Sequence, residues 1–410
     1  MGRMLGSREL REFAVDDTAE FFAQLRAALA GEGPALLPRP AGWSGPSDEL
    51  RGATVPGDVA LVIETSGSTA APKRVLLTAE GLIAGAHATH VRLGGERAGG
   101  EQWLLTLPAH YIAGAQVLVR SIVAGSEPVI ASGEHFTPEG FVADAARLTG
   151  ARRYVSLVPV QLRRLVDAAR SDARVAAALA RFDGILVGGQ ATPRELLAEA
   201  CALGWPVTTT YGSSETSGGA AYNGSPLSGV RMRAVDGELW VASPSLALGY
   251  LGDAERTGRT FVADEAGDRW YRTGDAGTVA PDGTIAVTGR FDSVIISGGV
   301  KVNLDEVTLA ASSAGDFPEV VAVAVPSREW GDRVALLAAD AAATEPTIDA
   351  SEDARWQRIS SALEPLGAAA RPALTARIPE LLRLASGKPD RSALRELAED
   401  LARGLEASAN

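Results

Sequence analysis

The sequence contains little cysteine, little lysine and no long apolar run. Its single cysteine, Cys201, cannot form an internal disulfide, which fits a reducing environment such as the cytoplasm. No uninterrupted apolar stretch approaches the ~18 residues of a membrane-spanning helix, and the first residues lack the apolar core of a signal peptide. We therefore expect a cytoplasmic protein without a transmembrane segment.

Basic charge is scarce as well, since the formal net charge is −12 at pH 7. A nucleic-acid-binding protein needs a basic face, so we expect no nucleic acid as a partner. The apolar content of 46% is that of an ordinary globular protein, and 410 residues are too many for one core. Two or three domains are expected.

Lysine occurs only at positions 73, 301 and 388, whereas the other Lys/Arg positions are all arginine. A lysine ammonium is a compact point charge, and an arginine guanidinium is a planar fork of donors. Lys73 and Lys388 are therefore candidates for sites in which the fork does not fit. The alternative is that these lysines are ordinary surface residues.

Residues 59–78 combine two apolar runs with a polar glycine-containing loop. The runs Val59–Ile63 and Val75–Leu77 predict a strand, a loop and a second strand. Hydroxyls, a glycine that lets a ligand approach the backbone and one lysine suit a polyphosphate, although the spacing of a Walker loop is absent. A polar hairpin turn is the alternative. The candidate phosphate-binding residues are Thr65, Ser66, Gly67, Ser68, Thr69 and Lys73.

The part of the chain before this loop gives few signals. Residues 1–58 predict one helix, Asp17–Ala30, followed by a Pro/Gly-rich connection, Gly31–Pro46. From 128 to 211, short β-rich runs alternate with helical stretches, which predicts a mainly parallel sheet.

Two glycine-containing segments follow strands of this predicted sheet, at the edge where ligands bind in such folds. The first, Gly188, Gly189 and Gln190, offers a flat surface to an adenine ring. The second comprises Tyr211, Gly212, Ser213, Ser214 and Glu215. Its hydroxyls suit phosphate, and the Glu215 carboxylate suits a Mg²⁺ shared with the phosphates. Taken singly, each segment is more often an ordinary turn between strand and helix.

Residues 229–289 change to a pattern that predicts an antiparallel β subdomain. Asp275 in this part is either a ligand for the two hydroxyls of a ribose or a solvated turn residue. We place a domain boundary at Arg290–Asp292, before a small α/β unit with Lys388 in a turn near its end. The elements expected in this unit are strands at Val320–Val325 and Val334–Ala338 and helices at Ala354–Leu363 and Arg391–Leu401.

Taken in order, these segments resemble the acyl-adenylate-forming ligases, which include acyl-CoA synthetases, adenylation domains and luciferase-like enzymes. Each motif is weak by itself, but six motifs in the right order leave little room for chance. The resemblance covers roughly residues 58–395. The matching segments are Thr65–Lys73 (phosphate loop), Gly188–Gln190 (adenine surface), Tyr211–Glu215 (Y-G-x-[ST]-E), Tyr271–Asp275 (T-G-D), Arg290–Asp292 (hinge) and Ser386–Lys388 (catalytic lysine).

The resemblance implies an α/β fold with two domains. The large ATP- and acyl-binding domain, residues 1–289, would contain mainly parallel sheets and a β subdomain. A hinge at 290–292 would connect it to a small mobile α/β domain, residues 293–410, that carries the catalytic lysine. The sequence departs from the family at Ala70-Ala71, where a glycine is usual, and in a short N-terminal region.

The family's reaction has two steps. Mg²⁺ and ATP first convert a carboxylate into an acyl-adenylate, and the thiol of CoA then displaces AMP. By resemblance, Lys388 stabilises the first transition state, and Lys73 holds pyrophosphate together with the loop hydroxyls. Asp275 and Arg290 would bind the ribose.

The resemblance also implies a rearrangement between the two steps. The small domain would swing about Asp292, and Gly298 and Gly299 would then form a narrow passage for the pantetheine arm of CoA. His110, which directly follows a predicted strand, is placed at the acyl end of the pocket, where it gates or orients the carboxylate rather than acting as a required base. The alternative is that His110 is an ordinary structural histidine.

Residues 107–114 and 117–121 and the short N-terminal region look most like the 2-succinylbenzoate–CoA ligases of menaquinone biosynthesis. The arginine-rich composition fits a GC-rich bacterial genome. Arg120 is the candidate group for binding a second carboxylate of the acid, and a surface salt bridge is its alternative role.

Two other classes of function remain. One is a stand-alone adenylating enzyme for another aryl or short acyl acid that loads CoA or a carrier-protein thiol. The other is a non-catalytic nucleotide-binding regulator, against which the presence of both Lys73 and Lys388 argues. The expected partners are a small carboxylic acid, ATP and CoA, and a homodimer is left open.

Overall fold

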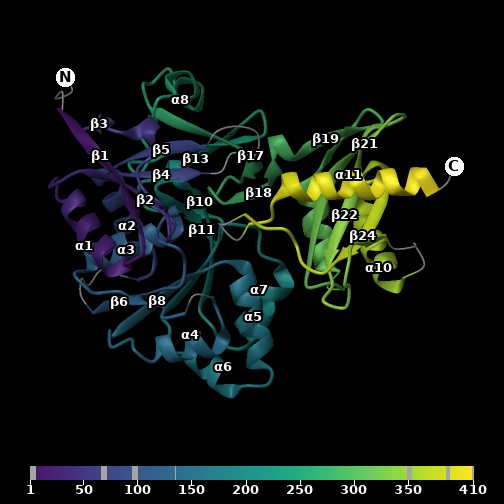
Figure 1. The fold of residues 1–410 in the computed structure, drawn as a ribbon, viewed down its shortest axis with the longest axis horizontal. Coiled ribbons are helices and arrows are strands. Elements are labelled where there is room, and N and C mark those ends of the chain that lie inside the picture. Colours follow the sequence, from purple (N-terminus) through teal and green to yellow (C-terminus); the bar gives the residue numbers. More distant parts are fainter. Residues whose placement is uncertain are drawn as a thin grey trace.

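The computed structural model describes residues 6–65, 72–94, 100–133, 135–314, 316–348, 353–384 and 388–408. Figure 1 shows a large body, coloured purple to green, and a smaller lobe, coloured green to yellow, that contains the last part of the chain. In the described part of the chain, no helix is long and apolar enough to cross a membrane.

The first sheet has six described strands in the order β15-β5-β4-β2-β1-β3. Its strands β4 and β5 are antiparallel with Thr65 opposite Lys73, so the two predicted strands are confirmed. The candidate loop residues Ser66, Gly67, Ser68 and Thr69 lie outside the described residues. The strand bounds are β1 Ser7–Ala14, β2 Ala35–Arg39, β3 Thr54–Pro56, β4 Val59–Thr65, β5 Lys73–Thr78 and β15 Gly249–Tyr250.

The first 58 residues contain more regular structure than the sequence predicted. Helix α1 (Thr18–Leu29) is confirmed, and the Asp17 carboxylate caps it by accepting hydrogen bonds from two backbone N–H groups. The interpretation of Gly31–Pro46 as a plain connection was wrong, because it contains β2, which lies between β1 and β4 and is parallel to both. A strand buried on both faces has no polar–apolar alternation to reveal it.

The second sheet has seven described strands in the order β12-β11-β10-β9-β8-β6-β7. Strands β7, β6, β8, β9 and β10 are all parallel, which confirms the predicted parallel sheet, and β11 and β12 add antiparallel hairpins. The bounds are β6 Glu101–Leu105, β7 Val129–Ile130, β8 Arg152–Leu157, β9 Gly184–Val187, β10 Val207–Ser213, β11 Gly218–Tyr222 and β12 Ser225–Pro226.

Helices cover both faces of this second sheet. Helices α2 and α3 share one buried core with α1, the first sheet and part of the second sheet. Helices α4 to α7 pack on the opposite face around a separate core and lie at the bottom of Figure 1. The bounds are α2 Ala79–Arg92, α3 Ile112–Ala124, α4 Pro138–Ala145, α5 Pro159–Ala169, α6 Ala173–Leu179 and α7 Arg194–Ala202.

The third sheet is antiparallel, as residues 229–289 predicted. Its order is β13-β14-β17-β16, with β18 paired to β17. The bounds are β13 Arg231–Val235, β14 Glu238–Ala242, β16 Phe261–Ala263, β17 Arg269–Val279 and β18 Ile285–Arg290, with α8 at Ala254–Thr260.

The fourth sheet forms the smaller lobe, in the order β20-β19-β22-β24-β23 with β21 paired to β22. The predicted strands and helices of this lobe are all present, and α10 has the predicted bounds. Apolar clusters fill both faces of the sheet, one against α9 and α10 and one against α11. The bounds are β19 Val294–Ser297, β20 Val300–Asn303, β21 Glu319–Ser327, β22 Gly331–Ala339, β23 Thr347–Ile348, β24 Leu374–Ile378, α9 Leu304–Ser313, α10 Ala354–Leu363 and α11 Arg391–Ser408.

The α/β fold class is therefore confirmed, and the domain boundary at 290–292 stays a prediction. The link between the two lobes is formed by β18 and a short turn of helix, Phe291–Ser293. The Asp305 carboxylate accepts a hydrogen bond from the backbone N–H of Arg290 at 3.0 Å. Arg391 at the start of α11 donates to Ser293 and forms an ion pair with Asp305.

Close pairing of β17 with β18 gives a stability prediction at Gly277. A Cβ added there would lie 2.4 Å from the backbone oxygen of Ala286. Gly277→Ala should therefore lower the free energy of unfolding by about 1–3 kcal/mol, the range for overpacking a filled site. Thermal melts provide the measurement.

Gly258 in α8 is the matched control, because a Cβ there meets no atom within 4 Å. Gly258→Ala should leave the melting temperature unchanged or raise it slightly, since alanine favours a helix over glycine by about 1 kcal/mol. Equal melting temperatures for the two variants would contradict the packing argument.

Candidate active site

Asp275, the predicted ribose ligand, lies between two donors from distant parts of the chain. The Tyr211 hydroxyl donates to its Oδ2 at 2.6 Å, and the Arg290 guanidinium donates to its Oδ1 at 2.9 Å. Asp275 and Arg290 are also opposite each other in the β17–β18 pairing. Burial raises the pKa of the Asp275 carboxyl, and the bonds to Tyr211 and Arg290 act in the opposite direction. The structure thus joins three of the predicted nucleotide-site residues.

The glycines of the two predicted ligand-binding segments are also required by the packing of the sheet. A Cβ on Gly188 would lie 2.0 Å from the Thr210 hydroxyl oxygen, and one on Gly212 would lie 1.9 Å from the Gly218 backbone oxygen. Gly189 has a φ of +83°, which side chains rarely adopt. The sheet therefore requires these glycines whether or not a ligand is bound. The lack of side chains at Gly188 and Gly189, next to Gln190, remains compatible with the close approach of a planar ring.

Glu215, the predicted magnesium ligand, is 8% exposed and follows β10 in a single 3₁₀ turn, Ser214–Thr216. The Tyr250 hydroxyl donates to its Oε1 at 2.9 Å, and the Ala247 N–H donates to its backbone oxygen at 2.8 Å. In the described ranges, no three His, Cys, Asp or Glu side chains are grouped so as to hold a metal. A single carboxylate is nevertheless what Mg²⁺ uses when phosphate oxygens and water complete its coordination.

Lys388 lies in a loop whose base is fixed by hydrogen bonds. The Leu384 N–H donates to the Lys388 carbonyl at 2.9 Å, and the Asp390 N–H donates to the Leu382 carbonyl at 2.8 Å. Ser386 and Gly387, the other predicted residues of this motif, lie outside the described residues.

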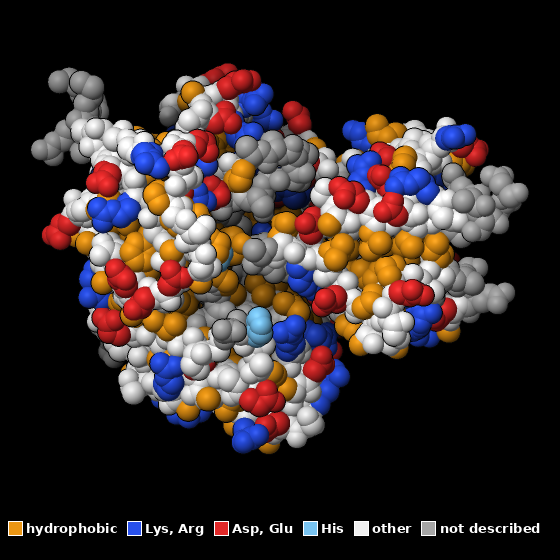
Figure 2. Space-filling view, viewed as in Figure 1, with side chains coloured by type: hydrophobic (Ala, Val, Ile, Leu, Met, Phe, Trp, Pro, Cys, Tyr) orange, Lys and Arg blue, Asp and Glu red, His pale blue; other side chains and the backbone are white. Residues whose placement is uncertain are grey.

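The surroundings of Lys388 include the two candidate carboxylates of the large body. The side chain keeps contact with solvent, but desolvation lowers the pKa of its ammonium, and Arg290 acts in the same direction. Glu215 and Asp275 act against this shift. Figure 2 shows a hollow between the large body and the smaller lobe, with charged side chains at its edges. The charges of Glu215 and Asp275 therefore act on the ammonium of Lys388, without a direct hydrogen bond or ion pair to it among the described residues.

The predicted hinge and tunnel residues lie on the smaller lobe's side of the structure. Asp292 accepts two hydrogen bonds from Arg290, at 2.8 and 3.1 Å. Gly298 and Gly299 have φ values of +58° and +82° and form the turn between β19 and β20. Among the described residues, no hydrogen bond or ion pair joins this turn to Asp275 or Glu215.

His110 precedes α3 and is half-buried against Tyr111, with ring centroids 4.1 Å apart. Its Nε2 is buried and has no hydrogen-bond partner among the described residues. Desolvation lowers the pKa of the imidazole. The arrangement gives a neutral ring with an unused nitrogen, which is able to bond a polar ligand.

Arg120, on the same helix, is 8% exposed, so its alternative role in a surface salt bridge is wrong. Its guanidinium lies over the Trp103 ring, 4.9 Å from the centroid, and makes long hydrogen bonds to the hydroxyls of Ser156 (3.4 Å) and Tyr222 (3.5 Å). In the part of the chain that the structure describes, Nε has no partner and no carboxylate pairs with the group. A buried charge of this kind is costly unless something neutralises it.

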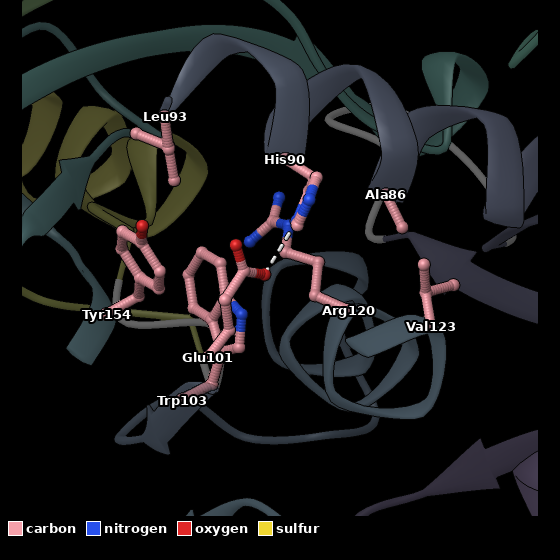
Figure 3. A pocket seen from close by; sticks show the side chains of 8 residues that line it. All are labelled: Ala86, His90, Leu93, Glu101, Trp103, Arg120, Val123 and Tyr154. Carbon is pink, nitrogen blue, oxygen red and sulfur yellow. Dashed lines mark hydrogen bonds and ion pairs between the residues drawn. The ribbon is translucent and has the colours of Figure 1, made fainter. Parts of the chain in front are cut away.

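A small cavity borders Arg120, and Figure 3 shows its lining. Helices α2 and α3 form one side, and β6 and β8 form the other. His90 Nδ1 and Glu101 Oε2 are paired at 2.7 Å beside it. The lining residues are Ala86, His90, Leu93, Glu101, Trp103, Arg120, Val123 and Tyr154.

Sequence reasoning missed Tyr250, the hydrogen-bond donor to Glu215. The two residues are 35 positions apart, and Tyr250 belongs to a strand of only two residues. The sole sequence signal was an apolar stretch that ends in Gly249-Tyr250 before a turn.

Comparison with known proteins agrees with this geometry. Residues 23–251 match the model of the AMP-binding enzyme family. The chain is 37% identical over 353 residues to a probable 2-succinylbenzoate–CoA ligase of Mycobacterium tuberculosis, covering 84% of this chain and 88% of that protein.

Two further similarities are to a nonribosomal peptide synthetase and to a solved structure. The chain is 31% identical over 379 residues to CymA of Salinispora arenicola, a probable non-canonical nonribosomal peptide synthetase, covering 86% of this chain and 5% of that protein. The structure of o-succinylbenzoate CoA synthetase (MenE) from Bacillus subtilis with the acyl-adenylate OSB-AMP superposes with a TM-score of 0.68 at 22% identity, covering 92% of this chain and 80% of that chain. The similarity to the Bacillus subtilis structure shows that the two proteins share a fold.

The buried imidazole of His110 gives a prediction about pH. Because burial depresses its pKa below the ordinary 6.5, the folded protein should keep His110 neutral at pH values where the unfolded chain already binds a proton. This contribution to stability should be present above pH 6.5 and decline as the pH falls through 6.5. NMR titration of the imidazole signal that is absent from His110→Gln provides the measurement, and a midpoint at or above 6.5 would contradict it.

Proposed function

The chain belongs to the family of AMP-binding enzymes, and from this premise we propose that it is an ATP-dependent 2-succinylbenzoate–CoA ligase. The observation that carries the proposal is the 37% identity to a probable ligase of this kind over most of both chains. The buried Arg120, which lacks a carboxylate partner among the described residues, supports an acid with a second carboxylate. The known fold also agrees, since the Bacillus subtilis synthetase has the same architecture.

The chemistry explains why such an enzyme uses ATP. A carboxylate does not react with a thiol, because oxide is a very poor leaving group. In the first step, a carboxylate oxygen attacks the α-phosphorus of ATP, and the bond from that phosphorus to pyrophosphate breaks. In the second, the CoA thiol loses its proton, its sulfur attacks the acyl carbon, and the bond to AMP breaks.

In this proposal, residues from several separate segments of the chain hold the nucleotide. Asp275, fixed by Tyr211 and Arg290, accepts hydrogen bonds from the ribose hydroxyls. The backbone at Gly188 and Gly189 lies against the adenine. Lys73 and the loop after Thr65 bind the pyrophosphate portion.

Glu215 is the residue of the described chain that would bind Mg²⁺, which supplies charge neutralisation on the phosphates. Lys388 stabilises the charge that develops on phosphorus, since fixed cations lower the barrier where charge builds up. The electrostatic influence of Glu215 and Asp275 on Lys388 supports this role. The second step then requires movement of the smaller lobe about Asp292, which brings Gly298 and Gly299 to the thiol.

His110 and Arg120 would bind the two ends of the acid. His110 lies just before α3, with its unused Nε2 near the start of that helix, and Arg120 lies further along the same helix. His110 orients the reacting carboxylate, and Arg120 pairs with the distant one.

A second function is a stand-alone adenylating enzyme that loads a carrier-protein thiol. The 31% identity to CymA, a probable nonribosomal peptide synthetase, is the observation in its favour. Both functions use the same ATP site, so they differ only in acid and in thiol.

The test is ATP–pyrophosphate exchange with a panel of acids, followed by thioester formation with CoA. We expect exchange with 2-succinylbenzoate above that with benzoate or fatty acids, and formation of a CoA thioester. Exchange with another acid, or no product with CoA while a carrier protein is loaded, would favour the second function.

Arg120→Met gives a prediction about the acid. The substitution conserves volume and removes the charge, so the KM for a dicarboxylic aryl acid should rise about 10- to 150-fold, equivalent to about 1.5–3 kcal/mol for a lost charged hydrogen bond. The KM for ATP should stay the same. Steady-state kinetics of exchange provide the measurement, and unchanged constants for both substrates would remove Arg120 from the acid site.

Lys388→Ala should separate the two steps. Acyl-adenylate formation should fall at least about 10²–10³-fold, as is typical for loss of one transition-state donor. Thioester formation from preformed acyl-adenylate and CoA should be nearly unchanged, because the lysine is needed only for the first step. Rapid-quench measurement of each step provides the check.

Lys388→Arg is the matched variant, and it should not restore the first step, because the planar fork does not replace a compact ammonium. Equal loss in both steps would indicate a folding defect. No loss in either step would mean that Lys388 is a solvated turn residue.

A further inference from the structure

Glu215 is a buried carboxylate that no basic side chain of the described ranges bonds directly, although the charge of the Lys388 ammonium acts on it from beyond bonding distance. It is 8% exposed, and no arginine or lysine of the described residues forms an ion pair with it. Among the described residues, the hydrogen bond to its carboxylate comes from the Tyr250 hydroxyl, 2.9 Å from Oε1. Buried carboxylates are ordinarily paired with a cation or bound to a metal. A neutral phenol satisfies one oxygen only, so the other oxygen is available to a cation.

Tyr250 is held firmly in its place. It pairs with Val75 across the β15–β5 contact, and its N–H donates to the Thr257 hydroxyl at 2.9 Å. The side chain is 6% exposed and packs against Phe261, with ring centroids 5.9 Å apart. The phenol therefore has little freedom to follow a moving carboxylate, and the carboxylate must instead adapt to the phenol.

The same segment also fixes the backbone of Glu215. The Ala247 N–H donates to the Glu215 carbonyl at 2.8 Å, three residues before the Tyr250 side chain bonds the carboxylate. Gly249 between them has a φ of +156°, and a Cβ there would lie 2.5 Å from the Thr257 side chain. Residues 247–250 therefore hold Glu215 at both its main chain and its side chain.

We propose that Tyr250 is a positioning residue that fixes Oε1 of Glu215 and so presents Oε2 to the divalent cation that accompanies ATP. This inference rests on the proposed function, because it assumes that Glu215 binds the cation. Hydrogen-bonded partners of metal ligands usually set ligand orientation and change metal affinity about 10- to 100-fold.

Tyr250→Phe tests the proposal, because it keeps the ring and removes the donor. The readout is the affinity for Mn²⁺, measured by electron paramagnetic resonance in the presence of α,β-methylene-ATP, which does not react. We expect Mn²⁺ binding about 10- to 100-fold weaker than in the unmodified protein. Binding of the nucleotide without metal should stay the same.

Tyr222→Phe is the matched control, because it removes a buried phenol hydroxyl that contacts Thr89 at 2.9 Å and Arg120 at 3.5 Å and makes no hydrogen bond to Glu215. It should leave Mn²⁺ affinity unchanged. The double variant Glu215→Gln/Tyr250→Phe should bind Mn²⁺ no more weakly than Glu215→Gln, because the phenol acts only through the carboxylate.

The outcomes separate this inference from the function on which it rests. Weaker Mn²⁺ binding in Glu215→Gln with unchanged binding in Tyr250→Phe would overturn the role of Tyr250 and keep that of Glu215. Unchanged binding in both variants would overturn both. If Tyr250→Phe does not fold, Thr257→Val loosens Tyr250 without removing its hydroxyl. Weaker Mn²⁺ binding in that variant supports positioning, and a lower melting temperature with unchanged Mn²⁺ binding overturns it.

Discussion

The ion pairs of Arg290 are the interaction on which the arrangement of the candidate site depends. One guanidinium binds Asp275 in the third sheet and, through its other nitrogens, Asp292 at the beginning of the smaller lobe. The pairing of β17 with β18 places Asp275 opposite Arg290 at this point. A fork with five donors serves both carboxylates at once, which a lysine does not do. Orientation of the proposed ribose ligand and orientation of the link between lobes are therefore controlled by the same side chain.

The charge pattern of the site follows from its burial. Asp275, Glu215, Arg290 and Lys388 come from four separate segments, and their charges act on one another. Arg120 forms a contrasting case, since its charge is enclosed by hydroxyls and an indole face rather than by carboxylates. A buried charge without a counter-charge lowers the stability of the folded protein unless a bound ligand compensates for it. On the face shown in Figure 2, acidic and basic side chains are interspersed. The buried Arg120, by contrast, has no acidic side chain paired with it among the described residues.

Much of the fold was predictable from local patterns. The runs on both sides of residues 66–71, the alternation of strands and helices up to residue 211 and the bounds of α10 all follow from periodicity and turn residues. Strand β2 did not follow, because both of its faces are buried and no alternation remains. Among the candidate site residues, Asp275 and Glu215 were proposed from motif order, whereas the contacts between residues 211 and 275 and between residues 215 and 250 depend on tertiary packing. The burial of Arg120 was likewise invisible, because a single arginine in an apolar helix has the same sequence signature at the surface.

The position of β15 at the edge of the first sheet has a consequence for synthesis of the chain. Its partner β5 ends at Thr78, and about 170 residues must be added before Gly249 and Tyr250 can complete the sheet. At roughly 5–20 residues per second, that interval lasts about 10–30 s, during which one edge of β5 has no strand beside it. Unpaired edges recruit other chains, so the nascent protein passes through a period of exposure to mispairing. Closure of the sheet and placement of the phenol beside Glu215 then occur in a single event, late in translation of the large body.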